Sequence, residues 1–236
     1  MTNDEGGITM SNDISIVTSK MPAHIQEGSG MGNENVTSDH ISVPRVKLLQ
    51  KMNNEVDPNH SEYIDGAKEG DFINTVTGEN YGSSLIVVNT HFKEEYVVWR
   101  KRTEGGGLVG NFPTRQEAEK YLEDNSLDGD KHDITQTHIH TLLRLDEESQ
   151  EVSDIPFLFD CASSKLKVSR DWNVQLLKLG GKVNRFSYMW RMSSVPQSNA
   201  KGTWVNIDIE PVGWLKKEAY EKVETFYNNT FVNNVS

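Results

Sequence analysis

The chain has 236 residues, a formal net charge of -11 and 25% charged residues. No apolar run approaches the ~18 residues of a membrane span, and the first residues lack the basic and apolar regions of a secretion signal. We therefore expect neither membrane insertion nor export. The single cysteine, Cys161, excludes an intrachain disulfide, and we expect it to be a small buried apolar residue rather than a nucleophile.

The first 40 residues differ in composition from the rest of the chain. They contain no aromatic residue, are rich in Gly, Ser, Asn and Thr, and have six acidic residues against one lysine. Such a segment buries too little apolar surface to offset the entropy lost on ordering. The sequence predicts a disordered acidic arm over residues 1–40, an ordered domain over 41–217, and a C-terminal helix with a frayed tail over 218–236.

The first half of the ordered domain has the patterns of an antiparallel sheet. Alternating and β-branched runs at 71–76, 83–89 and 91–102 predict strands. The glycine-rich loop after Glu104 lacks the spacing of a phosphate-binding loop, and we interpret it as a hairpin tip. Thr114 with Glu117 forms a capping box that predicts a helix over 115–123.

Residues 136–145 alternate like a strand and place His138 and His140 on one face. An HxH pair is able to bind zinc, but no third ligand has suitable spacing. We expect solvent-facing strand histidines and no metal or other cofactor.

The segment from Cys161 to Lys217 has ten basic and three acidic residues, and four of the five tryptophans. Its patterns predict a helix over 164–179, a hairpin pairing 186–192 with 202–211, and a helix over 216–227. Two explanations of its composition stay open. The segment lines a groove that stacks bases and neutralises phosphates, or it forms a β-rich core with solvated lysines outside.

Three runs resemble a known family: GAKEGDFINTVTGE from Gly66, LIVVNTHFKEEYVVWRKRTEGGGLVG from Leu85, and SSKLKVSRDWN from Ser163. They are similar to a family of small proteins from tailed-bacteriophage replication and recombination modules, described as single-stranded DNA-binding proteins. The resemblance spans about residues 43–214. It implies an α+β fold with an OB-like antiparallel β-barrel core, peripheral helices, and binding of single-stranded DNA without sequence preference. The chain departs from the family at its end, NNTFVNNVS, which lacks the acidic tail that recruits replication proteins.

Under this hypothesis, aromatic rings stack on bases and basic side chains contact phosphates. The candidates for stacking are Trp99, Trp172, Tyr188 and Trp190. The candidates for phosphate contacts are Arg100, Lys101, Arg102, Lys165, Lys167, Arg170, Arg185 and Arg191. For each tryptophan alone, core packing is the competing explanation.

The partners expected from this interpretation are single-stranded DNA, phage replication proteins and further copies of the chain, in the cytoplasm of an infected bacterial host. Two alternatives are kept. The chain is a phage structural or host-interaction protein whose aromatic residues form an interface, or it is a metal-dependent nuclease. The carboxylates considered for the nuclease are Asp71, Asp160, Asp208 and Glu210. No catalytic motif of known spacing supports it, so we expect a protein that is not an enzyme.

Overall fold

We analysed a computed structural model, which describes residues 43–180, 182–200 and 202–233. The expected disordered arm, residues 1–40, lies outside this part. Among the described residues the main sheet has six antiparallel strands in the order β6–β5–β3–β7–β8, with β4 paired to the far end of β3. The strands are β3 (Ser84–Arg100), β4 (Leu108–Phe112), β5 (His132–Leu145), β6 (Phe157–Ala162), β7 (Tyr188–Asn199) and β8 (Gly202–Trp214). A small sheet pairs β1 (Val46–Leu48) with β2 (Phe72–Asn74).

The fold class is α+β and the main sheet is antiparallel, as expected, but the sheet does not close into a barrel. In the described part of the chain β6 and β8 form its two edges. The helix α2 (Lys165–Lys178) contacts both of these strands. Because α2 lies between the two edges, they do not pair with one another, so the expected OB-like closure is not found.

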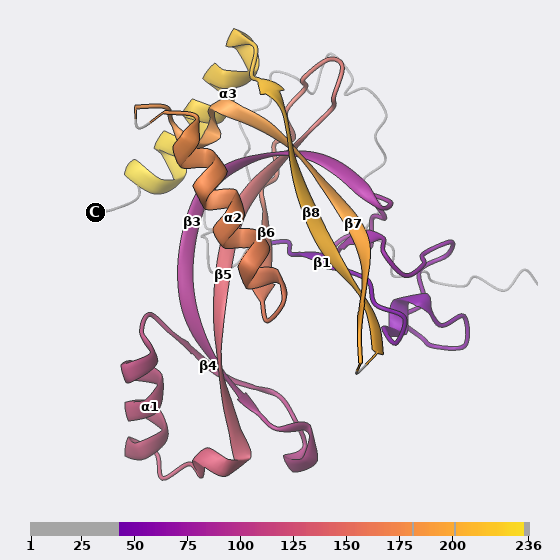
Figure 1. Cartoon of the computed structure of the whole chain (residues 1–236), viewed down its shortest axis with the longest axis vertical. Helices are drawn as coiled ribbons and strands as arrows, with labels where there is room; N and C mark the ends of the chain where they lie inside the picture. Colours follow the sequence, from indigo (N-terminus) through magenta and orange to yellow (C-terminus); the bar gives the residue numbers. More distant parts are fainter. Residues whose placement is uncertain (1–42, 181, 201, 234–236) are drawn as a thin grey trace, which may run out of the picture.

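Two arms extend from the centre of the molecule (Figure 1). One consists of the outer halves of β3 and β5 with β4 and α1 (Arg115–Asp124), and the other is the β7–β8 hairpin. The first arm arises because β3 and β5 pair along nearly their whole length, whereas β7 pairs only with the first residues of β3. Beyond that point no second strand pairs with β7 in the described part of the chain, which explains why Pro196 is accepted in a strand that runs past the expected 186–192.

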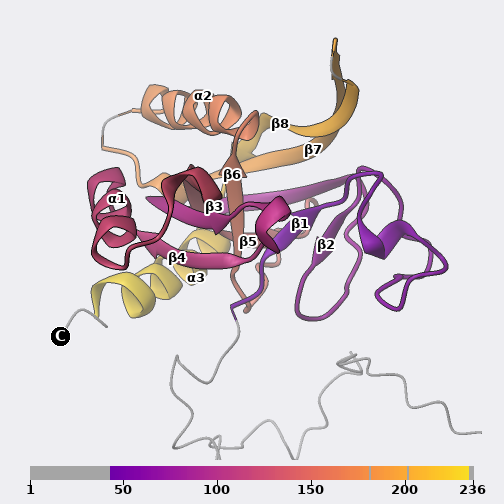
Figure 2. The same cartoon turned by 90° about the horizontal axis from the view of Figure 1, so that it is seen from below.

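The two faces of the sheet have separate cores. Leu85, Val87 and Ile207 face α2, whereas Ile86, Val88 and Leu143 face α3 (Lys217–Tyr227). This difference follows from the period of two along a strand, which sends neighbouring side chains to opposite faces. Figure 2 shows α2 and α3 on opposite sides of the sheet.

The helices begin and end close to the residues expected from their sequence patterns. The Thr114 side chain accepts a hydrogen bond from the Glu117 backbone N–H at 3.2 Å, which confirms the predicted cap of α1. The helix α2 covers 165–178 where 164–179 was expected, although Ser164 makes no side-chain cap. Cys161 is buried, and burial raises the pKa of its thiol to about 12. It is therefore a core residue, as expected.

Trp172 provides a test of this packing. It is completely buried and contacts Trp190 edge-on at 6.0 Å between ring centroids. We expect Trp172→Ala to lower the free energy of unfolding by about 3–5 kcal/mol in urea denaturation, because the lost ring leaves a cavity. Leu177→Ala on the same helix is the matched control: its side chain is 74% exposed, so its effect should stay within about 0.5 kcal/mol. Equal effects of the two changes would contradict the assigned helix face.

Candidate nucleic-acid interface and a buried polar relay

The structure separates the four aromatic residues expected to stack on bases. Trp172 and Trp190 are completely buried, so their rings are unavailable to a ligand in this conformation. Tyr188 is partly buried between Trp190 and Trp214, with centroid distances of 5.3 and 4.9 Å. Trp99, at the end of β3, is 43% exposed. The interpretation of Trp172 and Trp190 as stacking residues is therefore corrected: core packing, the competing explanation, describes both.

Of the three basic residues at the turn between β3 and β4, two have no carboxylate partner in the described part of the chain. We call residues 99–108 the hairpin tip. Arg100 and Arg102 are exposed, and neither has a carboxylate partner among the described residues. Lys101 donates to the Asp130 carbonyl at 2.6 Å and lies 3.8 Å from the Asp133 carboxylate. The tip thus combines an exposed indole with two unpaired guanidinium groups.

The basic residues of α2 are partly neutralised. Lys167 pairs with Asp171 at 2.9 Å, one helical turn away. Arg170 donates to the Gln136 side-chain oxygen at 3.2 Å, and Lys165 has no carboxylate partner in the described part of the chain. Arg170 and Lys165 therefore remain available for an anionic ligand.

The last two candidate cations are already engaged. Arg185 is largely buried and donates to Asn89 at 2.8 Å and to Asn173 at 2.6 Å. Arg191 forms an ion pair with Glu147. The twelve candidate residues therefore do not gather on one surface. They divide into the hairpin tip, the outer side of α2, and a remainder whose side chains are buried or already engaged with other residues.

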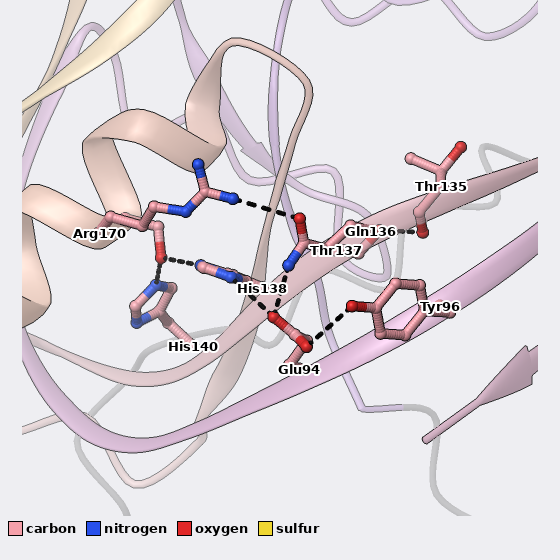
Figure 3. Close-up of polar contacts among 9 residues, drawn as sticks. Glu94, Tyr96, Thr135, Gln136, Thr137, His138, His140 and Arg170 are labelled. Atoms are coloured by element: carbon pink, nitrogen blue, oxygen red, sulfur yellow. Dashed lines mark hydrogen bonds and ion pairs between the residues drawn. The ribbon is translucent and has the colours of Figure 1, made fainter. Parts of the chain in front are cut away.

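The histidines at 138 and 140 are not solvent-facing, and that expectation was wrong. Both are buried beneath α2, and both contact the Ser169 hydroxyl: His138 Nδ1 at 2.8 Å and His140 Nε2 at 2.7 Å. Figure 3 shows the two imidazoles between the helix and the strands, with His138 pointing toward Glu94. His138 Nε2 lies 3.2 Å from the Glu94 carboxylate.

The hydrogen bonds in this cluster run in one consistent direction. Arg185 only donates, so Asn89 accepts with its oxygen and offers its amide N–H to His140 Nδ1 at 2.9 Å. His140 then donates from Nε2 to Ser169. The Ser169 hydroxyl donates to His138 Nδ1, and His138 donates from Nε2 to Glu94. We call this chain of donors, from Arg185 to Glu94, the polar relay.

Burial and charge set the protonation of the polar relay. Burial, aided by the nearby positive Arg185, lowers the pKa of His140 to about 3, so this imidazole is neutral. Burial also lowers the pKa of Arg185 to about 10, which leaves it charged at neutral pH. Burial raises the pKa of Glu94, but hydrogen bonds from Gln136, Tyr96 and His138 outweigh it and hold the pKa below its usual value. The relay thus joins the charged Arg185 to the Glu94 carboxylate through hydrogen bonds of Asn89, His140, Ser169 and His138.

Ser169, His138 and Glu94 have the order of a nucleophile, a base and a carboxylate. However, Ser169 has no exposed surface, and a second histidine also occupies its oxygen. No substrate reaches this hydroxyl in the structure as it stands. The relay instead fastens α2 to β5 and β3. The HxH spacing indicated the histidines, but nothing in the local sequence indicated Ser169, which lies 29 residues from His140.

The four carboxylates considered for a nuclease do not form a metal site. No group of three His, Cys, Asp or Glu placed to hold a metal occurs within residues 43–180, 182–200 and 202–233. Asp71 is buried and accepts from the Asn80 amide at 2.9 Å, while Asp160 pairs with Arg45. In the same part of the chain, no helix is both long and apolar enough to cross a membrane.

In comparison with known proteins, residues 12–235 match the model of the family described as Pam3 phage gp34-like protein. The chain belongs to this family. The expectation of a bacteriophage protein is thereby confirmed, whereas the single-stranded DNA-binding activity remains a prediction. No curated protein and no solved structure matches the chain.

Removing the Ser169 hydroxyl tests the polar relay. Ser169→Ala leaves His138 Nδ1 and the His140 N–H without a partner, at a cost of about 1–3 kcal/mol for each buried group. We expect a loss of this order in the free energy of unfolding, measured by urea denaturation. Ser164→Ala is the matched control, because Ser164 precedes the same helix, is exposed and makes no side-chain cap. A Ser169→Ala protein as stable as this control would show that the relay is not formed.

The buried neutral state of His140 predicts acid sensitivity. Its pKa is about 3 in the folded protein and near 6.5 when unfolded. Between these values only the unfolded chain binds the proton, so stability falls as pH falls, with a slope approaching 1.4 kcal/mol per pH unit. Carboxylates also titrate in this range. The measurement is therefore the difference between wild type and His140→Gln in chemical denaturation from about pH 7 to 4. Parallel curves for the two proteins would contradict a neutral buried His140.

Proposed function

We propose that this phage protein binds single-stranded DNA without sequence preference, in replication or recombination of the phage genome, in the cytoplasm of the infected host. The observation that carries the proposal is the hairpin tip, where Trp99 is 43% exposed beside Arg100 and Arg102. A stacked base gains roughly 1–3 kcal/mol from an aromatic ring regardless of its identity. The unpaired guanidinium groups supply the phosphate contacts that such binding needs.

The proposed contact surface is smaller than the sequence suggested. Strand alternation directs Arg100 to the same face as Tyr96, and it directs Trp99 to the opposite face with its cross-strand partner Leu108. A strand of DNA that crosses the tip would therefore meet the ring on one side and Arg100 on the other. Arg170 and Lys165 on α2 are the further candidates on the Tyr96 side, because Arg170 contacts Gln136, which pairs with Tyr96.

A partner-binding role is the second candidate function, as expected of a phage structural or host-interaction protein. Trp214 is 55% exposed at the end of β8 and rests edge-on against Tyr188 at 4.9 Å. Leu177 and Val174 are exposed on α2, which contacts β8. Exposed aromatic and aliphatic residues held in fixed positions are typical of protein interfaces. Phage replication proteins and a second copy of the chain are the partners we consider.

A titration with fluorescein-labelled oligo-dT, followed by anisotropy at two salt concentrations, tests DNA binding. We expect Trp99→Ala to weaken binding by about 10-fold, since one stacking contact is lost. We expect Arg100→Ala with Arg102→Ala to reduce the slope of log K against log salt by about 1.4, or about 0.7 for each phosphate contact.

Trp214→Ala is the matched control, because it removes an exposed tryptophan far along the chain from the tip. Its DNA affinity should equal that of wild type. Equal losses for Trp99→Ala and Trp214→Ala, or no binding at micromolar protein in low salt, would overturn the DNA-binding proposal. A stable protein partner lost on Trp214→Ala, with no DNA binding, would favour the second candidate function.

A further inference from the structure

The hairpin tip carries an exposed apolar pair on one face of its arm. Trp99 and Leu108 lie directly opposite each other where β3 pairs with β4, and the two residues are 43% and 59% exposed. Opposite side chains on one face of a sheet are neighbours, with Cβ atoms roughly 5 Å apart. Together they form one apolar surface that is wider than the indole alone. This surface lies at the free end of the arm that contains β4 and α1 (Figure 1).

The turn of the hairpin tip consists of three glycines that have almost no neighbours. Gly105, Gly106 and Gly107 have φ angles of +96°, +67° and +112°, which L side chains rarely adopt. An added Cβ would meet no atom within 4 Å at Gly105 or Gly107. At Gly106 the nearest atom is the Arg102 Cα, at 4.0 Å. No side chain of the described residues therefore blocks the end of the hairpin, so an extended strand is able to pass over it from one face of the sheet to the other.

The charges around the hairpin tip leave its β4 side open to an anion. Two carboxylates are held by lysines, at 3.8 and 3.9 Å: Asp133 by Lys101, and Glu104 by Lys131. Asp128 and Asp130 have no cation partner in the described part of the chain, but they precede β5, which pairs with the edge of β3 opposite to β4. Arg100 and Arg102 have no carboxylate partner in the same part of the chain. A phosphate that approaches from the side of β4 therefore meets two unpaired guanidinium groups, and the free carboxylates lie beyond β3.

We propose that the hairpin tip recognises the junction between single-stranded and double-stranded DNA. The inference rests on the proposed DNA binding and specifies its substrate. The last base pair of a duplex is a flat apolar surface two bases wide, whereas an unpaired base covers one ring. Trp99 and Leu108 side by side match the base pair, and the indole alone would be sufficient for the single base. The junction therefore accounts for the exposed leucine, which stacking on a single strand does not require.

The path of the single strand that leaves the junction follows from the same geometry. The strand would pass over the glycine turn, and its phosphates would then meet Arg102 in the turn and Arg100 on the opposite face. A guanidinium group binds phosphate oxygens through two parallel N–H donors, which fixes the path of the strand. The duplex and the single strand thus contact different faces of one hairpin, and the hairpin lies between them.

Fluorescence anisotropy with three fluorescein-labelled DNAs at one salt concentration tests junction recognition. They are an oligo-dT of about 16 nucleotides, the largest site of a single binding fold, a hairpin duplex carrying the same tail, and that duplex without a tail. We expect the tailed duplex to bind about 10-fold tighter than oligo-dT, because capping the last base pair adds a contact of stacking size. The duplex without a tail should bind more weakly than the tailed duplex, because it offers no single strand to Arg100 and Arg102.

Leu108→Ala is the decisive variant, because it narrows the apolar surface without removing the indole. We expect the ratio of the affinities for tailed duplex and oligo-dT to fall close to 1. Ile155→Ala is the matched control: Ile155 is 52% exposed and precedes β6, far along the chain from the tip, so the ratio should stay that of wild type. Both residues are exposed, so neither change should alter the urea denaturation curve.

A fluorescent base gives a second readout that uses only the wild-type protein. 2-Aminopurine in the last base pair of the tailed duplex should lose fluorescence when Trp99 stacks on it. The same base in the middle of the duplex should be unaffected. Unchanged fluorescence of the last base pair at saturation would contradict the junction site.

The outcomes separate the junction from the DNA binding on which it rests. No binding to any of the three DNAs would overturn both. Equal wild-type affinities for oligo-dT and the tailed duplex, or equal ratios for Leu108→Ala and Ile155→Ala, would overturn the junction alone and leave single-strand binding intact. A protein partner lost on Leu108→Ala, in the absence of DNA binding, would assign the apolar pair to a protein interface and overturn the inference.

Discussion

The docking of α2 onto the sheet is the interaction on which the rest of the structure depends. Trp172 and Ser169 are three residues apart, so they lie on the same side of the helix. Trp172 stacks on His140 at 4.8 Å, and Ser169 contacts both His138 and His140. A slide of α2 by one turn would withdraw the ring from its core and leave two buried imidazoles unpaired. Apolar packing and polar contacts therefore favour the same position of the helix along the sheet. Neither kind of contact alone would select this position.

This docking also determines the shape of the sheet. Because α2 contacts β6 and β8, it occupies the space across which these edge strands would need to approach in order to pair. The long β3–β5 pair and the β7–β8 hairpin are then free to diverge into two arms (Figure 1). The outer half of β3 has little cover from α2, and α1 supplies it by packing Ala118 and Leu122 against Val98. Trp99, next along the strand, is left exposed at the tip.

Local features of the fold could be predicted from the sequence, and long-range ones could not. Caps and apolar spacing placed α1 and α2 to within one residue, and alternation predicted the hairpin that pairs β7 with β8. Barrel closure depends on which strands become edges, and no local pattern records this. The burial of Trp172 and Trp190 could not be predicted from the sequence either, because an indole suits both a core and a stacking surface. The buried position of His138 and His140 depends on their contacts with Ser169, which lies in a different element, α2.

The distribution of charge along the chain did not predict which cations stay unpaired, because their partners also come from other elements. The basic segment from Cys161 to Lys217 is preceded by an acidic loop at 146–154, and folding brings the two together. Glu147 pairs with Arg191, the Glu148 carbonyl accepts from Lys216, and Asp154 pairs with Lys222 just beyond the segment. Such pairs add little stability at a surface, but they remove cations from any surface offered to an anion. What an anionic ligand meets is the set of cations that folding leaves without a carboxylate partner; among the candidates, Arg100 and Arg102 adjoin Trp99 in the hairpin tip, and Arg170 and Lys165 lie on α2.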